Sequence, residues 1–404
     1  MSKHFDNIVI GAGSFGAWTA LSLRRRGREV VLIEAHAPGH NRSSSGGESR
    51  VIRMGYGPND IYSRWSKRAL ELWLELFART GRPLFYRTGV LWLARDPEPY
   101  VSASLAAFDG LEIPHEVLSR QQLARRYGQV ELDEVTTWGL LELESGVLMA
   151  RRAVQTVVEQ AVREGVEYIC DEVLPLEPLA AAAEPSDPTV SRPIAQRADL
   201  EQVVTRSGRT VKVASNGAVV FACGPWLAKV FPALLGNRIF NSRQEVFFFG
   251  TPPGDSRFAP PALPTWMDLA SEAYGLPELE GRGLKAAIDR HGPAFDPDTG
   301  DRLPTREGVE QARRYLARRF PALKEAPLVE SRVCQYENTS NGDLLLDRHP
   351  AFQNVWLAGG GSGHGFKHGP SVGEYLVSCI LDDASPEPRF SLESKKVVQR
   401  RAIF

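Results

Sequence analysis

Cysteine is scarce in this 404-residue chain, and its four cysteines lie far apart. They stand at positions 170, 223, 334 and 379, with no Cys-X-X-Cys pair. This spacing provides neither a disulfide framework nor a zinc site. We therefore expect no metal centre and a reducing, cytoplasmic environment.

Long apolar runs and an excess of either charge are also missing. No apolar stretch approaches the roughly 20 residues that cross a membrane, and the first residues lack the pattern of a signal peptide. The formal net charge of −1 gives no reason to expect a nucleic-acid partner. A chain of 404 residues exceeds one typical domain, so we expect two domains or one elaborated α/β fold.

The N-terminal segment has the pattern of a dinucleotide-binding βαβ unit. A short apolar strand leads into GAGSFG (residues 11–16), then a helical pattern, then a second strand that ends at Glu34. Gly11 permits the tight turn, Gly13 lets the backbone approach a diphosphate, and Gly16 lets the helix lie close to the sheet. The helix N-terminus offers N–H groups to the phosphates, and Glu34 is placed to accept from ribose hydroxyls. FAD and NAD share this ADP half, so the motif alone leaves both open.

A second strand–glycine–helix pattern lies near the C-terminus, at residues 354–381. Between the two patterns, residues 60–81 predict an amphipathic helix and residues 152–163 another helix. Residues 179–196, rich in Ala, Pro and Ser, predict an exposed insertion. Because nucleotide-type strands occur at both ends of the chain, we expect a discontinuous domain, with a ligand crevice between two lobes.

Five blocks of sequence carry a resemblance to a known family. They are IVIGAGSFGAWTALSL with VVLIEAHAPGH, SSSGGESRVIRMGYG, GLKAAID with FDPDTGDR, VCQYENTSNGDLLLDRHP, and VWLAGGGSGHGFKHGPSVGEYL. Together they resemble the FAD-dependent amine oxidases of the glycine/D-amino-acid oxidase (DAO) family, in particular its monomeric sarcosine oxidase and N-methyltryptophan oxidase branch. Both ends of the chain match well, whereas residues 95–270 match only in outline.

The resemblance implies an α/β fold with two domains. A discontinuous Rossmann-like FAD-binding domain of the GR2 type would contain residues 1–85, 146–228 and 328–385. An α+β substrate domain with a mixed or antiparallel sheet would contain residues 86–145 and 229–327. Residues 386–404 would form a basic C-terminal tail.

The same resemblance implies roles for several cationic residues. Arg53 and Lys367 match the two family residues that bind a substrate carboxylate, for which a guanidinium fork is well suited. Arg50 matches an arginine held against the flavin. Lys285 matches a lysine near flavin N5 that promotes oxygen reduction. Taken alone, the arginines could be paired surface residues and Lys285 an exposed loop lysine.

Other residues are implied as neighbours of the flavin or the substrate. Tyr274 and Tyr336 are candidate aromatic walls of the substrate pocket, and His364 is either a flavin neighbour with a catalytic role or a structural histidine. Cys334 falls where the branch carries the cysteine bonded to the flavin, although an isolated strand cysteine is usually core filler. The residues expected to hold FAD are Gly11, Gly13, Ser14, Phe15, Gly16, Glu34, Ala35, Ser44, Ser49, Arg50, Val173, Gly224, Trp226, Cys334, Gly361, Gly363, His364, Gly365, Phe366 and Lys367.

The sequence also departs from the branch. Asp289 stands where relatives have a histidine four residues beyond the lysine, and His291 follows. Met54 and Gly55 alter the continuation after Arg53, and Gly361 replaces an aromatic residue. A substrate other than sarcosine is therefore expected, and the glycines are expected to make room for a larger side chain.

These observations predict an FAD-dependent oxidase of an amino acid amine, N-methylated or cyclic, that acts as a monomer. The amine gives an imine that water hydrolyses, and O₂ gives H₂O₂. A dehydrogenase of the same fold with another electron acceptor, an NAD-linked enzyme and a non-enzymatic flavin-binding interaction protein remain the alternatives.

Overall fold

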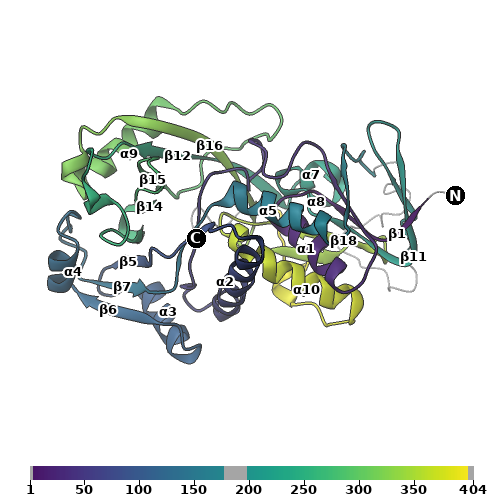
Figure 1. Cartoon of the computed structure of the whole chain (residues 1–404), viewed down its shortest axis with the longest axis horizontal. Helices are drawn as coiled ribbons and strands as arrows, with labels where there is room; N and C mark the ends of the chain where they lie inside the picture. The colour runs from purple at the N-terminus through teal and green to yellow at the C-terminus, as the bar shows by residue number, and fades with distance from the viewer. Residues whose placement is uncertain (1–2, 177–197, 399–404) are drawn as a thin grey trace.

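The computed structural model describes residues 3–176 and 198–398. The expected insertion at 179–196 and the last six residues of the expected tail, 399–404, lie outside the described residues. Figure 1 shows two lobes along the long axis of the molecule, each built around its own large sheet.

The first sheet has the strand order β17-β18-β11-β1-β2-β9, with β10 paired to β11. The five strands from β18 to β9 are parallel, and β17 and β10 pair antiparallel at their neighbours. The strands are β1 His4–Ile10, β2 Val30–Glu34, β9 Glu167–Cys170, β10 Gln202–Val204, β11 Thr210–Phe221, β17 Leu345–Arg348 and β18 Val355–Gly359. They come from three separated parts of the chain, as a discontinuous nucleotide-binding fold requires.

Helices cover this sheet because their apolar sides need a partner. Helix α1 (Ser14–Arg25) packs against α10 (Gly369–Leu381) and α5 (Ala150–Arg163), and Figure 1 shows the three side by side. The amphipathic pattern of residues 60–81 forms α2 (Asp60–Thr80), which ends at Gly81 in the left-handed region with φ 66°. None of the described helices is long and apolar enough to span a membrane.

The second sheet has the order β16-β12-β15-β14-β13-β5-β7-β6. Its strands are antiparallel except where β13 lies parallel to β5, so the sheet is mixed. They are β5 Val90–Ala94, β6 His115–Ser119, β7 Trp138–Glu142, β12 Ile239–Phe249, β13 Thr265–Asp268, β14 Ala273–Leu276, β15 Leu284–Ile288 and β16 Leu328–Thr339. Helices α3 (Pro99–Gly110), α4 (Arg120–Arg126) and α9 (Arg306–Arg319) belong to the same half of the molecule.

A third sheet has three strands in the order β3-β8-β4. It contains Arg50–Ile52, Gly146–Leu148 and Phe85–Tyr86. Short helices occur at α7 (Leu227–Val230), α8 (Pro232–Leu235), η2 (Gly224–Trp226), η3 (Ser256–Phe258), η4 (Leu269–Ser271), η5 (Pro321–Leu323), η6 (Gly365–His368) and η7 (Pro388–Phe390). The described part of the expected tail is anchored, because Phe390 is fully buried against Tyr62, Trp65 and Tyr375. The prediction of an α/β fold, with a Rossmann-like sheet of mainly parallel strands and a second, mixed sheet, is confirmed.

Candidate active site

A cavity of about 670 Å³, here called the larger cavity, lies at the carboxyl ends of the parallel strands. Each strand end contributes to its lining: Gly11 after β1, Glu34 at the end of β2, Ala222 after β11 and Gly361 after β18. In open parallel sheets, ligands bind at this edge. The larger cavity is therefore the expected place for a dinucleotide.

The glycines of the first turn have the predicted functions. A Cβ atom on Gly11, whose φ is 98°, would lie 2.4 Å from the carbonyl oxygen of Ala222. A Cβ atom on Gly16 would lie 1.9 Å from the carbonyl oxygen of Gly11. Gly13 lines the larger cavity, and a Cβ atom there would meet only the Ser45 hydroxyl, at 3.2 Å. No side chain caps the N-terminus of α1 that follows, so its N–H groups are available to a phosphate.

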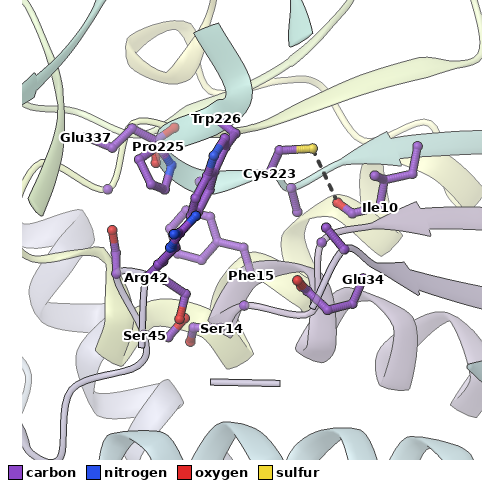
Figure 2. Close-up of a pocket in the computed structure, with 18 of the residues that line it drawn as sticks. Ile10, Ser14, Phe15, Glu34, Arg42, Ser45, Cys223, Pro225, Trp226 and Glu337 are labelled. Atoms are coloured by element: carbon purple, nitrogen blue, oxygen red, sulfur yellow. Dashed lines mark hydrogen bonds between the residues drawn. The ribbon is translucent and has the colours of Figure 1, made fainter. Parts of the chain in front are cut away.

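Glu34 is the acidic residue at the end of β2 that is predicted to bind the ribose. Its carboxylate accepts hydrogen bonds from the backbone N–H of Ala12 at 2.7 Å and of His36 at 3.1 Å. Burial raises the pKa of Glu34, and those N–H groups act in the opposite direction. Figure 2 shows Glu34 with Ser14, Phe15 and Trp226 in the lining of the larger cavity. An acid at the end of β2, a glycine turn and an uncapped helix N-terminus together fit the ADP half of FAD.

A second cavity of about 60 Å³, the smaller cavity, adjoins the larger one. The two share part of their lining: Arg50, Cys334, Tyr336, Gly363 and Phe366. The smaller cavity is also lined by Val51, Arg53, Gln244, Val246, Met267, Tyr274, Lys285, Asp289, His364 and Lys367. A substrate in the smaller cavity would therefore face a group bound in the larger one.

Cationic side chains dominate the smaller cavity. Arg53 is 2% exposed, and its guanidinium lies 4.3 Å from the centre of the Tyr56 ring and 5.0 Å from that of Trp92. It donates to the carbonyl oxygen of Gly55. The Lys367 ammonium donates to the Tyr56 hydroxyl at 2.8 Å and to the carbonyl oxygen of His364 at 3.0 Å. Burial, and then the nearby Arg53, hold the pKa of Lys367 well below its ordinary value.

Lys285 approaches the shared wall from β15. It is 2% exposed, and its Nζ donates to the carbonyl oxygen of Ser49 at 3.2 Å. Burial, followed by repulsion from Arg50, lowers the pKa of Lys285 to about 7. Its charge is thus poised to change near neutral pH.

Arg50 and Cys334 are in contact at the shared wall. Arg50 Nη2 lies 3.2 Å from Cys334 Sγ and also donates to the carbonyl oxygen of Ser44 at 2.8 Å. Cys334 lies on β16 and pairs with Gln244 of β12, which also lines the smaller cavity. Cys334 therefore lies on the wall that the two cavities share, with its Sγ atom in contact with a guanidinium.

The predicted residues divide between the two cavities. The larger cavity is lined by Gly11, Gly13, Ser14, Phe15, Glu34, Ala35, Ser44, Arg50, Val173, Gly224, Trp226, Cys334, Gly361, Gly363, Gly365 and Phe366. Arg53, Tyr274, Lys285, His364 and Lys367 line only the smaller one. Gly16 and Ser49 line neither: Gly16 packs against the Gly11 turn, and Ser49 accepts from Arg50 and Lys285 through its carbonyl oxygen.

The departures at Met54 and Gly55 do not enlarge the smaller cavity. A Cβ atom on Gly55 would lie 2.9 Å from the Trp92 ring and 3.0 Å from a Glu142 oxygen, so that space is already filled. Met54 is buried and lines neither cavity. The expectation that Gly55 makes room for a larger side chain is therefore wrong. Gly361 does open into the larger cavity, with no atom closer than 3.7 Å to the position of a Cβ.

Some lining residues were not predicted. Cys223, Arg42 and Glu337 line the larger cavity, as Figure 2 shows. Glu337 is next to Tyr336, and strand alternation assigns it to the opposite face from Cys334 and Tyr336. Cys334, Tyr336 and Glu337 nevertheless all line the larger cavity, which strand alternation does not predict.

The comparisons agree with this architecture. Residues 6–378 match the family described as FAD dependent oxidoreductase (DAO). A monomeric sarcosine oxidase of Bacillus sp. (strain NS-129) is 31% identical over 384 residues, which cover 93% of each chain. An N-methyl-L-tryptophan oxidase of Salmonella arizonae is 28% identical, with 96% of this chain and 97% of that protein covered. The crystal structure of an L-proline dehydrogenase from P. horikoshii superposes with a TM-score of 0.79 at 20% identity, with 97% and 98% covered.

The chain therefore belongs to the DAO family of FAD-dependent oxidoreductases. The resemblance stated from the sequence is confirmed, and so is the assignment to FAD-dependent enzymes over an NAD-linked class or a non-enzymatic binding protein.

Proposed function

We propose that this protein is an oxidase of an amino acid that carries a secondary amine, N-methylated or cyclic, and that O₂ is its electron acceptor. One observation carries the proposal: the smaller cavity gathers the buried cations Arg53, Lys367 and Lys285 beside the wall shared with the larger cavity. The names of the relatives, sarcosine oxidase and N-methyl-L-tryptophan oxidase, support the same substrate class.

In this proposal, Arg53 and Lys367 hold the substrate carboxylate. Arg53 offers a planar fork, kept in place by the Tyr56 and Trp92 rings, and Lys367 offers a point charge. Lys367 lies among groups that disfavour its charge, so an incoming carboxylate would stabilise its protonated form. Two cations that converge on one carboxylate fix the rest of the substrate in position.

The reaction needs the neutral amine. The cations of the smaller cavity disfavour a bound ammonium, so the substrate loses its proton without a dedicated protein base. FAD, when bound, supplies the two-electron acceptor for the carbon–hydrogen bond beside the nitrogen. The amine thereby loses two electrons and becomes an imine, water hydrolyses the imine, and O₂ takes up the two electrons with two protons to give H₂O₂. Lys285 supplies positive charge at the shared wall, where reduction of O₂ creates negative charge.

The test is a panel of amines screened for H₂O₂ with the purified protein, starting with sarcosine, N-methyltryptophan and L-pipecolate. We expect at least one secondary amino acid to yield peroxide in proportion to the O₂ consumed. Oxidation of an amine with an artificial electron acceptor, but without O₂ consumption, would establish the dehydrogenase alternative instead.

We also propose that FAD is covalently attached through Cys334. Cys334 lines both cavities, and a cysteine sulfur is a nucleophile that can bond to a flavin methyl carbon. Cys223 also lines the larger cavity, but burial raises the pKa of its thiol, which makes it a poor nucleophile.

Cys334→Ser is expected to abolish the attachment. After acid precipitation, the native protein should retain its yellow colour in the pellet, whereas Cys334→Ser should release FAD into the supernatant. Cys223→Ser is the matched control and should keep its flavin. A Cys334→Ser pellet that stays yellow would show that a residue other than Cys334 retains the flavin.

The expected monomeric state and cytoplasmic location also remain proposals. The relatives named monomeric sarcosine oxidase support the first. Light scattering of the purified protein tests it, with an expected mass close to the 44.6 kDa of one chain.

A further inference from the structure

Glu337 is a buried carboxyl group in the larger cavity that the proposed chemistry does not use. It lies on β16, three residues beyond Cys334, and pairs across the sheet with Asn241 of β12. Its side chain is adjacent to the last residue of β18: a Cβ atom on Gly359 would lie 2.5 Å from Glu337 Oε1. Figure 2 shows Glu337 beside Pro225, on the side of the view away from Glu34.

The carboxyl group has no cation to balance a charge. Glu337 is 7% exposed, and within residues 3–176 and 198–398 it forms no salt bridge. In the same described part of the chain, its Oε1 atom has no hydrogen-bond partner. An isolated buried carboxylate is costly, so the neutral acid is the favoured form.

The surroundings of Glu337 agree with a neutral acid. The glycines after β18 approach the Glu337 carboxyl group with backbone N–H groups. On the neighbouring strand β12, the residue paired with Glu337 is the uncharged Asn241. Cys223, two residues after β11, is a titratable neighbour of Glu337, and its thiol is neutral because burial raises its pKa. Burial raises the pKa of Glu337 to about 7, against the smaller opposite effect of the Gly360 and Gly361 N–H groups.

A neutral carboxyl group carries one O–H donor, and a buried donor needs an acceptor. We propose that Glu337, in its neutral form, donates a hydrogen bond to an oxygen of the FAD chain between the flavin ring and the adenosine. The acceptor is a ribityl hydroxyl or a phosphate oxygen. Glu337 is thus a positioning residue for the cofactor, whichever amine the enzyme oxidises.

The proposal predicts that FAD affinity depends on pH with a definite sign. The neutral acid binds FAD, and the hydrogen bond raises the pKa of Glu337 further in the complex. Affinity is therefore full at pH 6, where the free protein already holds the proton, and falls as pH rises through about 7. At pH 8 the free protein must first take up a proton, which weakens binding by about tenfold.

The experiment measures FAD binding by fluorescence quenching in a Cys334→Ser background, so that no covalent link forms. With Glu337 intact, Kd should rise about tenfold from pH 6 to pH 8. With Glu337→Gln, which keeps the shape and cannot ionise, Kd should change little over this interval. Glu330→Gln, at the other end of β16 and paired with Arg282, is the matched control and should keep the tenfold step.

ADP, which has the diphosphate but no ribityl chain, distinguishes the acceptors. The same pH step for ADP assigns a phosphate oxygen, and a flat profile assigns a ribityl hydroxyl. Equal pH dependence of FAD binding with and without Glu337 would overturn the proposal. If Glu337→Gln does not fold, a flat FAD profile with Glu337 intact is sufficient to reject it. The experiment measures cofactor binding, so its result does not depend on which amine the enzyme oxidises.

Discussion

Replacing Arg53 with methionine is expected to lower kcat/KM for an amino acid amine by two to three orders of magnitude. Truncation of one member of a buried charge pair costs about 2–5 kcal/mol, and about 1.4 kcal/mol corresponds to a factor of ten. Arg53 is almost fully buried, so water cannot replace it as a carboxylate partner. Methionine fills much of the space between the Tyr56 and Trp92 rings that the arginine stem occupies.

The design separates carboxylate binding from general damage. The same amine without its carboxylate should be oxidised at similar rates by the native protein and by Arg53→Met. Arg53→Lys keeps the charge but loses the fork, and should give an intermediate loss. An equal loss for both amines would contradict the assignment of Arg53 as a carboxylate ligand. Flavin content and melting temperature, measured on each variant, monitor the fold.

Replacing Lys285 with methionine is expected to slow the reaction of the reduced enzyme with O₂ by about 10²–10³-fold, the effect of removing one preorganised charge. Reduction of the enzyme by the amine should change much less. Stopped-flow measurement of the two half-reactions separates these effects. Lys285→Arg, which retains a positive charge, should keep most of the O₂ reactivity. A variant that loses the amine half-reaction instead would assign Lys285 to substrate binding.

The native O₂ half-reaction should also depend on pH with a sign set by Lys285. Burial and Arg50 lower the pKa of Lys285 to about 7, so the cation is present below this pH and lost above it. The rate should fall as pH rises through about 7, and the profile of Lys285→Met should be flat there. A native profile that rises with pH would contradict the cationic role.

Sequence reasoning predicted the nucleotide-binding half well because its signals are local. The turn at Gly11, the close packing at Gly16 and the acid at Glu34 each follow from the order of a few neighbouring residues. The clustering of Arg53, Lys285 and Lys367 is different, since these residues come from β3 and its continuation, β15 and η6. Family resemblance, not spacing, suggested that they meet.

The errors also have physical reasons. Gly55 was expected to open the substrate pocket, yet the space beside it is filled by the Trp92 ring and the Glu142 carboxylate. Glu142 accepts from the N–H groups of Met54 and Gly55 at 2.7 and 3.0 Å, and β7 brings it there from about 90 residues away. Local sequence gives no information about such a distant partner.

The central claim, that the smaller cavity binds a secondary amino acid for oxidation by FAD in the larger one, has a direct test. In the absence of oxygen, the purified protein is mixed with an amine from the panel, and the flavin absorbance at about 450 nm is followed. We predict that a secondary amino acid bleaches this band, and that air restores it with one H₂O₂ per flavin. A flavin that no secondary amino acid bleaches, or that stays bleached in air, would contradict the account.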